Sequence, residues 1–147
     1  MGQSTYSFLD SVVIISHPML PIPITIIGEG AGQITVSMSE VRTEHNVAAD
    51  GSVMVSKLAG NNGQITIDVQ QTSIAHKKLL AMFNILVQAA PSQWANAAMI
   101  IKNITDKTGQ ICTGISLQKV PDKTYAKAGA NVSWTLMAAD IESLTTV

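Results

Sequence analysis

Three glycines are the first residues whose spacing could do chemistry. Gly28, Gly30 and Gly32 follow an apolar run, as glycines do in loops that hold the pyrophosphate of a dinucleotide at the N-terminus of a helix. Residues 33–40 alternate between polar and apolar side chains, which predicts a strand where that site needs a helix. We therefore interpret the glycines as a turn and expect no bound cofactor.

The other reactive side chains form no catalytic or metal-binding pattern. His17, His45 and His76 fall on three different predicted elements, without cysteines at the spacing of zinc ligands. The single Cys112 lies within a predicted strand, where a buried apolar role is more common than a nucleophilic one. No serine has the Gly-x-Ser-x-Gly surroundings of a hydrolase nucleophile, and no pair of carboxylates suggests acid–base catalysis. We expect no metal site and no enzymatic activity; a small enzyme is kept only as a third alternative.

Low charge is the most informative feature of the composition. Asp, Glu, Lys and Arg make up 13% of the 147 residues and hydrophobic residues 46%, whereas soluble domains carry about 25% charged residues. The formal net charge of −1 lacks the basic excess with which proteins grip nucleic acid. We expect a surface with so little charge to be covered by copies of the same chain.

The stretch between Asp10 and Glu29 is apolar but does not predict a membrane span. Pro18, Pro21 and Pro23 prevent a continuous helix, so the stretch predicts two strands joined by an extended apolar connection in a subunit interface. The length suits one domain, 1–147. A lone cysteine and the lack of a basic, apolar leader predict a chain made inside the cell.

Alternation with a period of two determines the predicted fold class. Strands are predicted at 6–16, 33–40, 53–58, 64–70, 97–105, 110–120 and 132–141. One helix is predicted from Thr72 or Ser73 to about Ala90. Its apolar stripe consists of Leu79, Met82, Phe83, Leu86 and Ala90, widened by Leu80 and Val87. The chain is therefore predicted to be mainly β (α+β), a β-sandwich or barrel of two antiparallel sheets flanked by one α-helix.

The relatively charged segment 41–52 is longer than a tight hairpin requires. One interpretation is a solvated loop. The other is an arm that reaches a neighbouring subunit, with its mixed charges setting the register of the contact. The candidate contact residues are Arg42, Thr43, Glu44, His45, Asn46, Asp50 and Gly51.

Five short motifs occur in an order that resembles the tail tube proteins of contractile-tailed bacteriophages. They are YSFLD at 6–10, ADGS at 49–52, GQITIDVQQTS at 63–73, VPDKTYAK at 120–127 and WT at 134–135. The resemblance also extends to the tube proteins of type VI secretion systems and phage-tail-like bacteriocins. It implies a phage tail tube-like domain over 1–147 with an N-terminal arm and a long hairpin loop near 41–52, and no catalytic residues or cofactors.

The resemblance further implies six-membered rings whose inner sheets join into one barrel and which stack into a tube. The implied partners are a sheath, a tape-measure protein, a baseplate and a tail terminator, with genomic DNA passing through without specific binding. The protein would then be part of the virion, assembled in the cytoplasm of the host bacterium. The polar faces of two strands are the candidates for the lumen, with an ordinary solvent-exposed sheet face as the alternative. These residues are Thr35, Ser37, Ser39, Gln64, Thr66, Asp68 and Gln70.

Two other functions remain open at this stage. One is the tube of a bacteriocin or type VI-like machine. The other is a monomeric β-sandwich binding module, although an aromatic content of 4% is low for a surface that binds ligands by stacking.

Overall fold

A computed structural model describes residues 11–20, 22–26, 31–104, 107–122 and 125–145. Its elements in chain order are β1 (Ser11–Ser16), β2 (Ile24–Ile26), β3 (Ala31–Met38), β4 (Thr43–Val47), β5 (Val53–Lys57), β6 (Gly63–Gln70), α1 (Ile74–Gln88), the 3-10 helix η2 (Pro91–Gln93), β7 (Ala97–Asn103), β8 (Gly109–Leu117), β9 (Asn131–Ala138) and β10 (Asp140–Leu144). The first half of the strand predicted at 6–16 lies outside the described residues.

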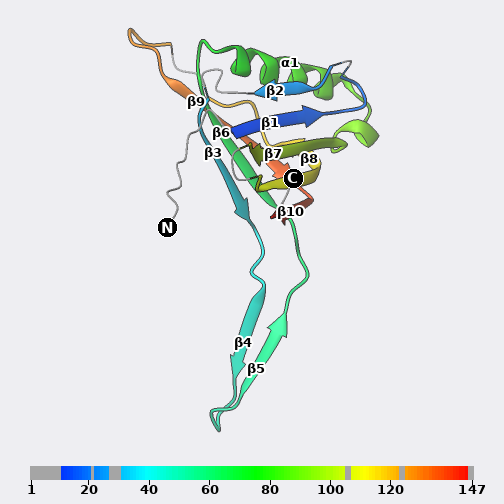
Figure 1. Ribbon diagram of the computed structural model, residues 1–147, viewed down its shortest axis with the longest axis vertical. Helices are drawn as coiled ribbons and strands as arrows, with labels where there is room; N and C mark the ends of the chain where they lie inside the picture. The colour runs from blue at the N-terminus through cyan, green and yellow to red at the C-terminus, as the bar shows by residue number, and fades with distance from the viewer. Residues whose placement is uncertain (1–10, 21, 27–30, 105–106, 123–124, 146–147) are drawn as a thin grey trace.

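Two antiparallel sheets form the body of the molecule (Figure 1). The first has the strand order β2-β1-β7-β8-β10, and the second has the order β3-β6-β9. The last residues of β8, Ser116 and Leu117, leave the first sheet and pair with β9. The predicted class, mainly β with two antiparallel sheets and one α-helix, is confirmed.

The sheets meet at a corner formed by Gly114 and Ala139. Gly114 has a φ of 64°, which favours glycine because other residues are strained there. The N–H of Ala139 donates to the carbonyl oxygens of Thr113 and Gly114, at 3.1 and 3.3 Å. The strand predicted at 132–141 is therefore wrong as one element, because this corner divides it into β9 and β10.

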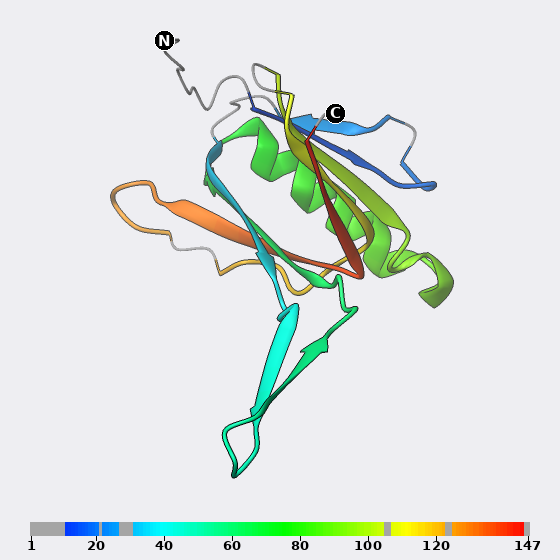
Figure 2. The same cartoon turned by 60° about the horizontal axis from the view of Figure 1, so that its bottom comes forward.

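The core fills the space between the two sheets and α1, which closes their open side (Figure 2). The predicted inward residues of the second sheet are buried; they are Ile65, Ile67 and Val69 on β6 and Val132, Trp134 and Leu136 on β9. At the centre, the indole N–H of Trp134 donates to Nδ1 of His76 at 3.0 Å. The predicted face of β3 is less enclosed, because Met38 is 40% exposed.

The helix begins and ends close to its predicted limits. Ser73 is the N-cap, and its Oγ accepts a hydrogen bond from the backbone N–H of His76 at 3.1 Å. Leu79, Met82 and Leu86 are buried as the stripe predicts. Val87 is 56% exposed and Ala90 lies beyond the helix, so the real stripe is narrower than predicted.

The proline-rich segment joins β1 and β2, the two strands predicted in this stretch, and the structure pairs them antiparallel. His17 holds this segment against η2, since its Nε2 lies 2.7 Å from the carbonyl oxygen of Gln93. Its Nδ1 accepts from the backbone N–H of Met19 at 3.0 Å. With these two partners, Nε2 is the donor and Nδ1 the acceptor of the ring. Ile22 remains 76% exposed, and its place in a subunit interface stays a prediction.

One predicted strand does not join the body. Val53–Lys57 pairs only with β4, and together they form a two-stranded hairpin that projects away from both sheets (Figure 1). Alternation alone cannot distinguish a strand in a sheet from a strand in an isolated hairpin, because both have the same period.

The corner yields a stability prediction. We expect Gly114→Ala to lower the free energy of unfolding by about 1–3 kcal/mol, because a non-glycine residue is strained at this φ. The new Cβ would also lie 2.7 Å from the Cβ of Ala139. Urea unfolding followed by tryptophan fluorescence measures the effect.

Gly129→Ala is the matched control, since a Cβ there meets no atom within 4 Å. Equal unfolding midpoints for the two variants would contradict the role of the corner.

Candidate assembly surfaces

The polar face of the second sheet carries six of the seven predicted lumen residues. They are Thr35 and Ser37 on β3 and Gln64, Thr66, Asp68 and Gln70 on β6. Ser39 lies beyond the end of β3, where its N–H donates to the carbonyl oxygen of Asn62. The structure thus brings the two predicted polar strands together but leaves one residue outside the face.

Sequence reasoning missed the third strand of this face. The register aligns Thr35, Thr66 and Thr135 in one row across β3, β6 and β9. The next row aligns Gln33, Asp68 and Ser133, with the hydroxyl of Ser133 donating to Asp68. The alternation of Ser133 and Thr135 with buried Val132, Trp134 and Leu136 was the signal that could have found them.

Asp68 is the only charged residue among these strand residues, and its carboxylate accepts a hydrogen bond from Ser133. A face of hydroxyl and amide groups has no cations to hold phosphates, each of which adds affinity for a nucleic acid. The face is therefore chemically suited to contact a polyanion without retaining it.

The two sides of this polar sheet are open among the described residues. β3 pairs with β6 along its length and has no partner on its other side. β9 pairs with β8 only at Met137 and Leu136, so its first residues, from Asn131 on, have a partner on one side only. Open edges present unpaired backbone N–H and C=O groups to another chain.

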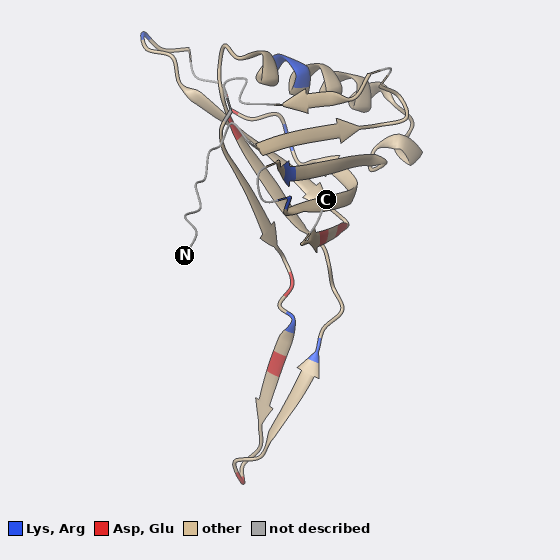
Figure 3. Cartoon of the chain, in the orientation of Figure 1, with Lys and Arg blue, Asp and Glu red and all other residues tan. Residues whose placement is uncertain are grey.

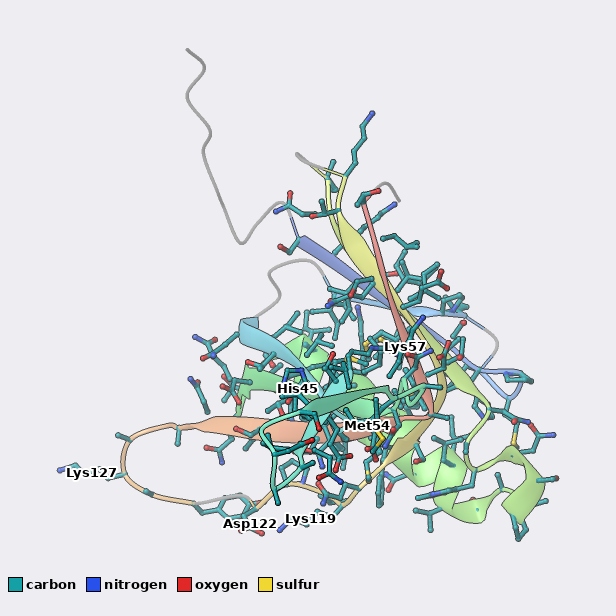
Figure 4. The ribbon with its side chains drawn as sticks, turned by 90° about the horizontal axis from the view of Figure 1, so that it is seen from below. His45, Met54, Lys57, Lys119, Asp122 and Lys127 are labelled. Carbon is teal, nitrogen blue, oxygen red and sulfur yellow. The ribbon has the colours of Figure 1, made fainter. Side chains whose placement is uncertain are left out.

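The hairpin holds all the predicted contact residues. Thr43, Glu44, His45 and Asn46 lie in β4, Arg42 precedes it, and Asp50 and Gly51 form the turn. Every residue from Val41 to Val55 is exposed. Figure 4 looks along the hairpin, with His45, Met54 and Lys57 labelled on it.

The two faces of the hairpin differ in chemistry. Cross-strand partners share a face, so the pairs Val47–Val53 and His45–Val55 place three valines on one side. These valines are between 50% and 65% exposed. The other side carries Glu44 opposite Ser56 and Asn46 opposite Met54. We call the first side the valine face; the sequence analysis, which looked at charge in this segment, missed it.

Asp50 holds the turn of the hairpin. Its Oδ1 accepts from the backbone N–H and the hydroxyl of Ser52, at 3.0 and 2.6 Å. The hydrogen bond from the Ser52 hydroxyl, followed by that from the Ser52 amide, holds the pKa of Asp50 below its ordinary value of 3.8. Gly51 has a φ of 88°, which this tight turn requires. Asp50 and Gly51 therefore shape the hairpin itself.

A groove of about 510 Å³ lies where the hairpin joins the body. It is lined by Met38, Arg42, Asn61 and the first four residues of β10, which include Asp140 and Glu142. The close approach of the strands here depends on Gly63, since a Cβ on it would lie 2.3 Å from the carbonyl oxygen of Ser37. The groove has a polar rim with two carboxylates.

The reactive side chains form no site in the described part of the chain. His17 and His76 are buried and are hydrogen-bonded to different residues, Gln93 and Trp134, and His45 lies on the hairpin. The described residues contain no group of three His, Cys, Asp or Glu side chains placed to hold a metal ion. Residues 28–30 of the glycine turn lie outside the described residues, and β3 follows them directly. None of the described helices combines the length and the apolar character needed to cross a membrane.

A polar sheet face between two open edges, together with a projecting hairpin, is typical of a subunit that completes its structure in an assembly. The chain matches the family described as Bacteriophage PhiTE tail tube protein over residues 3–145. It therefore belongs to this family of phage tail tube proteins, which confirms the resemblance. A comparison with curated proteins gives no match.

Solved structures of contractile machines have the same fold. A chain in the baseplate of the anti-feeding prophage, described as 6-fold symmetrised, is 16% identical with a TM-score of 0.60, covering 98% of this chain and 97% of its own. A chain in the extended sheath-tube complex of the extracellular contractile injection system PVC is 13% identical with a TM-score of 0.54, covering 90% and 87%. A chain in the tube-terminating cap of the anti-feeding prophage is 12% identical with a TM-score of 0.56, covering 99% and 95%. At these identities the likeness establishes the fold.

Cys112 yields a prediction about reactivity. Burial, followed by the charge of Asp140, raises the pKa of its thiol from 9.0 to about 11. We expect a thiol reagent such as Ellman's reagent to label the folded protein at pH 8 much more slowly than the protein in urea. Because the folded pKa is raised, the thiol's contribution to stability is complete below pH 9 and is lost as the pH rises towards 11.

The urea-unfolded chain is the internal control, because there the thiol has its ordinary pKa. Equal labelling rates in the two states would contradict the burial of Cys112.

Proposed function

We propose that this chain is the inner tail tube subunit of a contractile-tailed phage, a single domain over 1–147 that forms six-membered rings. The rings stack into a tube inside a sheath, and the tube conducts the genome during ejection. The observation that carries the proposal is the polar face of β3, β6 and β9, on which Asp68 is the only charged strand residue, bounded by two open edges.

Ring closure follows from these edges. The free edge of β3 in one subunit pairs with the open edge of β9, beside β8, in the next. Repeated around the ring, this pairing gives every inner strand two neighbours and closes the sheets into a barrel. The polar rows of Thr35 and Gln33 then face the lumen, together with the other predicted lumen residues.

Stacking is the role of the hairpin. An isolated two-stranded hairpin is marginally stable in water at best, and this one exposes three valines on one face. Burying the valine face against the adjacent ring removes this apolar surface from water. The charged residues Arg42, Glu44 and His45 then set the register of the contact, as the arm interpretation requires.

The partners follow from the family and from the related machines. The proposed partners are a sheath, a baseplate and a tail terminator, because the similar structures are a baseplate, a sheath-tube complex and a tube-terminating cap. A tape-measure protein occupies the tube before DNA passes without specific binding. The subunit assembles in the host cytoplasm, becomes part of the virion, and uses no cofactor and no catalysis.

The tube of an injection machine without DNA is the second candidate, because the similar structures come from such machines. Purified native particles with a capsid and DNA support the phage tail; particles that carry an effector and lack a capsid support the alternative.

Negative-stain electron microscopy of the purified protein at rising concentration tests the proposed function. We expect hollow rings and tubes of constant width with six-fold end views. Dispersed monomers at every concentration, confirmed by sizing, would return a monomeric binding module to consideration.

The valine face yields a sharper prediction. We expect Val47→Thr/Val53→Thr/Val55→Thr to abolish tubes while changing the free energy of unfolding by less than about 0.5 kcal/mol, because exposed substitutions are usually that mild. Threonine keeps the β-branched shape and strand preference of valine but replaces a methyl group by a hydroxyl. Pelleting of tubes and thermal unfolding of the unassembled protein are the two measurements.

Val87→Thr is the control, an exposed valine on α1 outside the hairpin. Normal tubes from the triple variant would show that the hairpin does not dock through its valine face.

A further inference from the structure

The charges of the described residues are distributed unevenly along the long axis of the molecule. Figure 3 shows acidic positions along β4, at the hairpin turn and on β10, and basic positions on α1 and at the tip of the connection between β8 and β9. Lys102 on β7 and Asp68 on β6 depart from this pattern. Five of the seven described Asp and Glu residues belong to residues 40–57 or to β10: Glu40, Glu44, Asp50, Asp140 and Glu142. Against two cations in the same region, Arg42 and Lys57, they leave a net charge of −3.

Four of these carboxylates surround the base of the hairpin, and we call them the acidic shoulder. They are Glu40, Glu44, Asp140 and Glu142. Two of them, Asp140 and Glu142, line the groove of about 510 Å³ beside Met38. Arg42 also lines this groove, where its guanidinium donates to the side-chain oxygen of Asn61. The shoulder therefore combines a concave, partly apolar floor with an excess of negative charge.

Two exposed lysines mark the opposite end, which we call the lysine end. Lys77 lies in the first turns of α1, and Lys127 lies in the connection between β8 and β9. Lys119, in the same connection, lies beside the middle of the second sheet, because the N–H of Gln118 donates to the carbonyl oxygen of Thr135. Figure 4 labels Lys119 and Lys127, with Lys127 at the tip of that connection, far from the hairpin. Asp122 is the only described carboxylate in the same connection.

We propose that the acidic shoulder of one copy docks on the lysine end of a second copy, which fixes the head-to-tail direction of stacking. This inference rests on the proposed function. The occupant is a second copy because the complementary charge lies on the same chain, at the end that faces the shoulder when copies are aligned in parallel. Such a contact joins two different surfaces, so it is heterologous and propagates without closing on itself.

Two features contribute to the contact. The valine face supplies apolar area, which does not favour one direction of stacking over the other. The charges make the inverted arrangement unfavourable, because two acidic shoulders or two lysine ends would then face each other. Asp50 is not part of the shoulder, since its carboxylate is engaged with Ser52 in the turn.

Charge reversal on each surface tests the inference. One variant carries Lys77→Glu and Lys127→Glu, the second carries Glu44→Lys and Glu142→Lys, and a third combines all four substitutions. We expect each double variant to raise the critical concentration for tube formation by about tenfold or more, because like charges then face each other. The fourfold variant restores tubes, because the reversed residues on the two surfaces again have opposite charges. Added salt should lower the critical concentration of the double variants and raise that of the natural sequence.

Lys107→Glu is the control, an exposed lysine in the β7–β8 turn outside both surfaces. Thermal unfolding of each unassembled variant confirms that the fold is intact. Double variants that assemble like the natural sequence would overturn the inference, as would a folded fourfold variant that does not recover. Absence of tubes from the natural sequence would instead overturn the proposed function, and this inference with it.

Discussion

The bend at Gly114 and Ala139 is the constraint on which the rest of the structure depends. β8 leaves the first sheet there and enters the second, and the β9–β10 chain turns back at the same point. A continuous flat sheet would leave one apolar face in water, whereas the bent one encloses Trp134 and needs only α1 to cover its open side. The corner therefore buries the apolar face of the second sheet and leaves its polar face outside.

The second sheet has features that would be a liability in a monomer. Proteins that fold alone usually protect edge strands with lysine, proline or short strand length. β3 is eight residues long and has neither a charged residue nor a proline. Its open edge is consistent with a strand whose partner is another chain. The low charge of the whole sequence fits the same proposal, because a subunit covered by its copies would need few charged residues to remain soluble.

Much of the fold can be predicted from the sequence, because local patterns determine it. The burial of Ile65, Ile67 and Val69 follows from alternation, and the start of α1 follows from the capping hydroxyl of Ser73. The corner cannot be predicted in the same way, since no glycine or proline marks a bend near Ala139 in the sequence and the bend depends on contact with Gly114. The isolation of β5 also depends on tertiary structure.

The residues of the candidate surfaces could be predicted from the sequence only where a single segment contains the whole pattern that defines the surface. The polar residues of β3 and β6 were found, but the row through Ser133 and Thr135 needs the β6–β9 register. In the hairpin, attention to charge identified Glu44 but missed the valines, because their shared face appears only when Val47 is known to pair with Val53. Asp50 was interpreted as an intersubunit contact, whereas its carboxylate stabilises its own turn.

The hairpin also explains how a chain with open edges can remain specific. Its two strands are not part of the hydrophobic core. The hairpin therefore neither stabilises nor destabilises the body, and the body does not stabilise the hairpin. In the proposed assembly, a neighbouring subunit buries the valine face, and only a surface with the correct shape and charge offers that contact. Exposed edges provide strong but indiscriminate backbone pairing, whereas the hairpin would add side-chain selectivity from residues such as Glu44. Strand pairing and hairpin docking would then act in different directions, one around a ring and the other along its axis, and a misaligned copy could satisfy one only by losing the other.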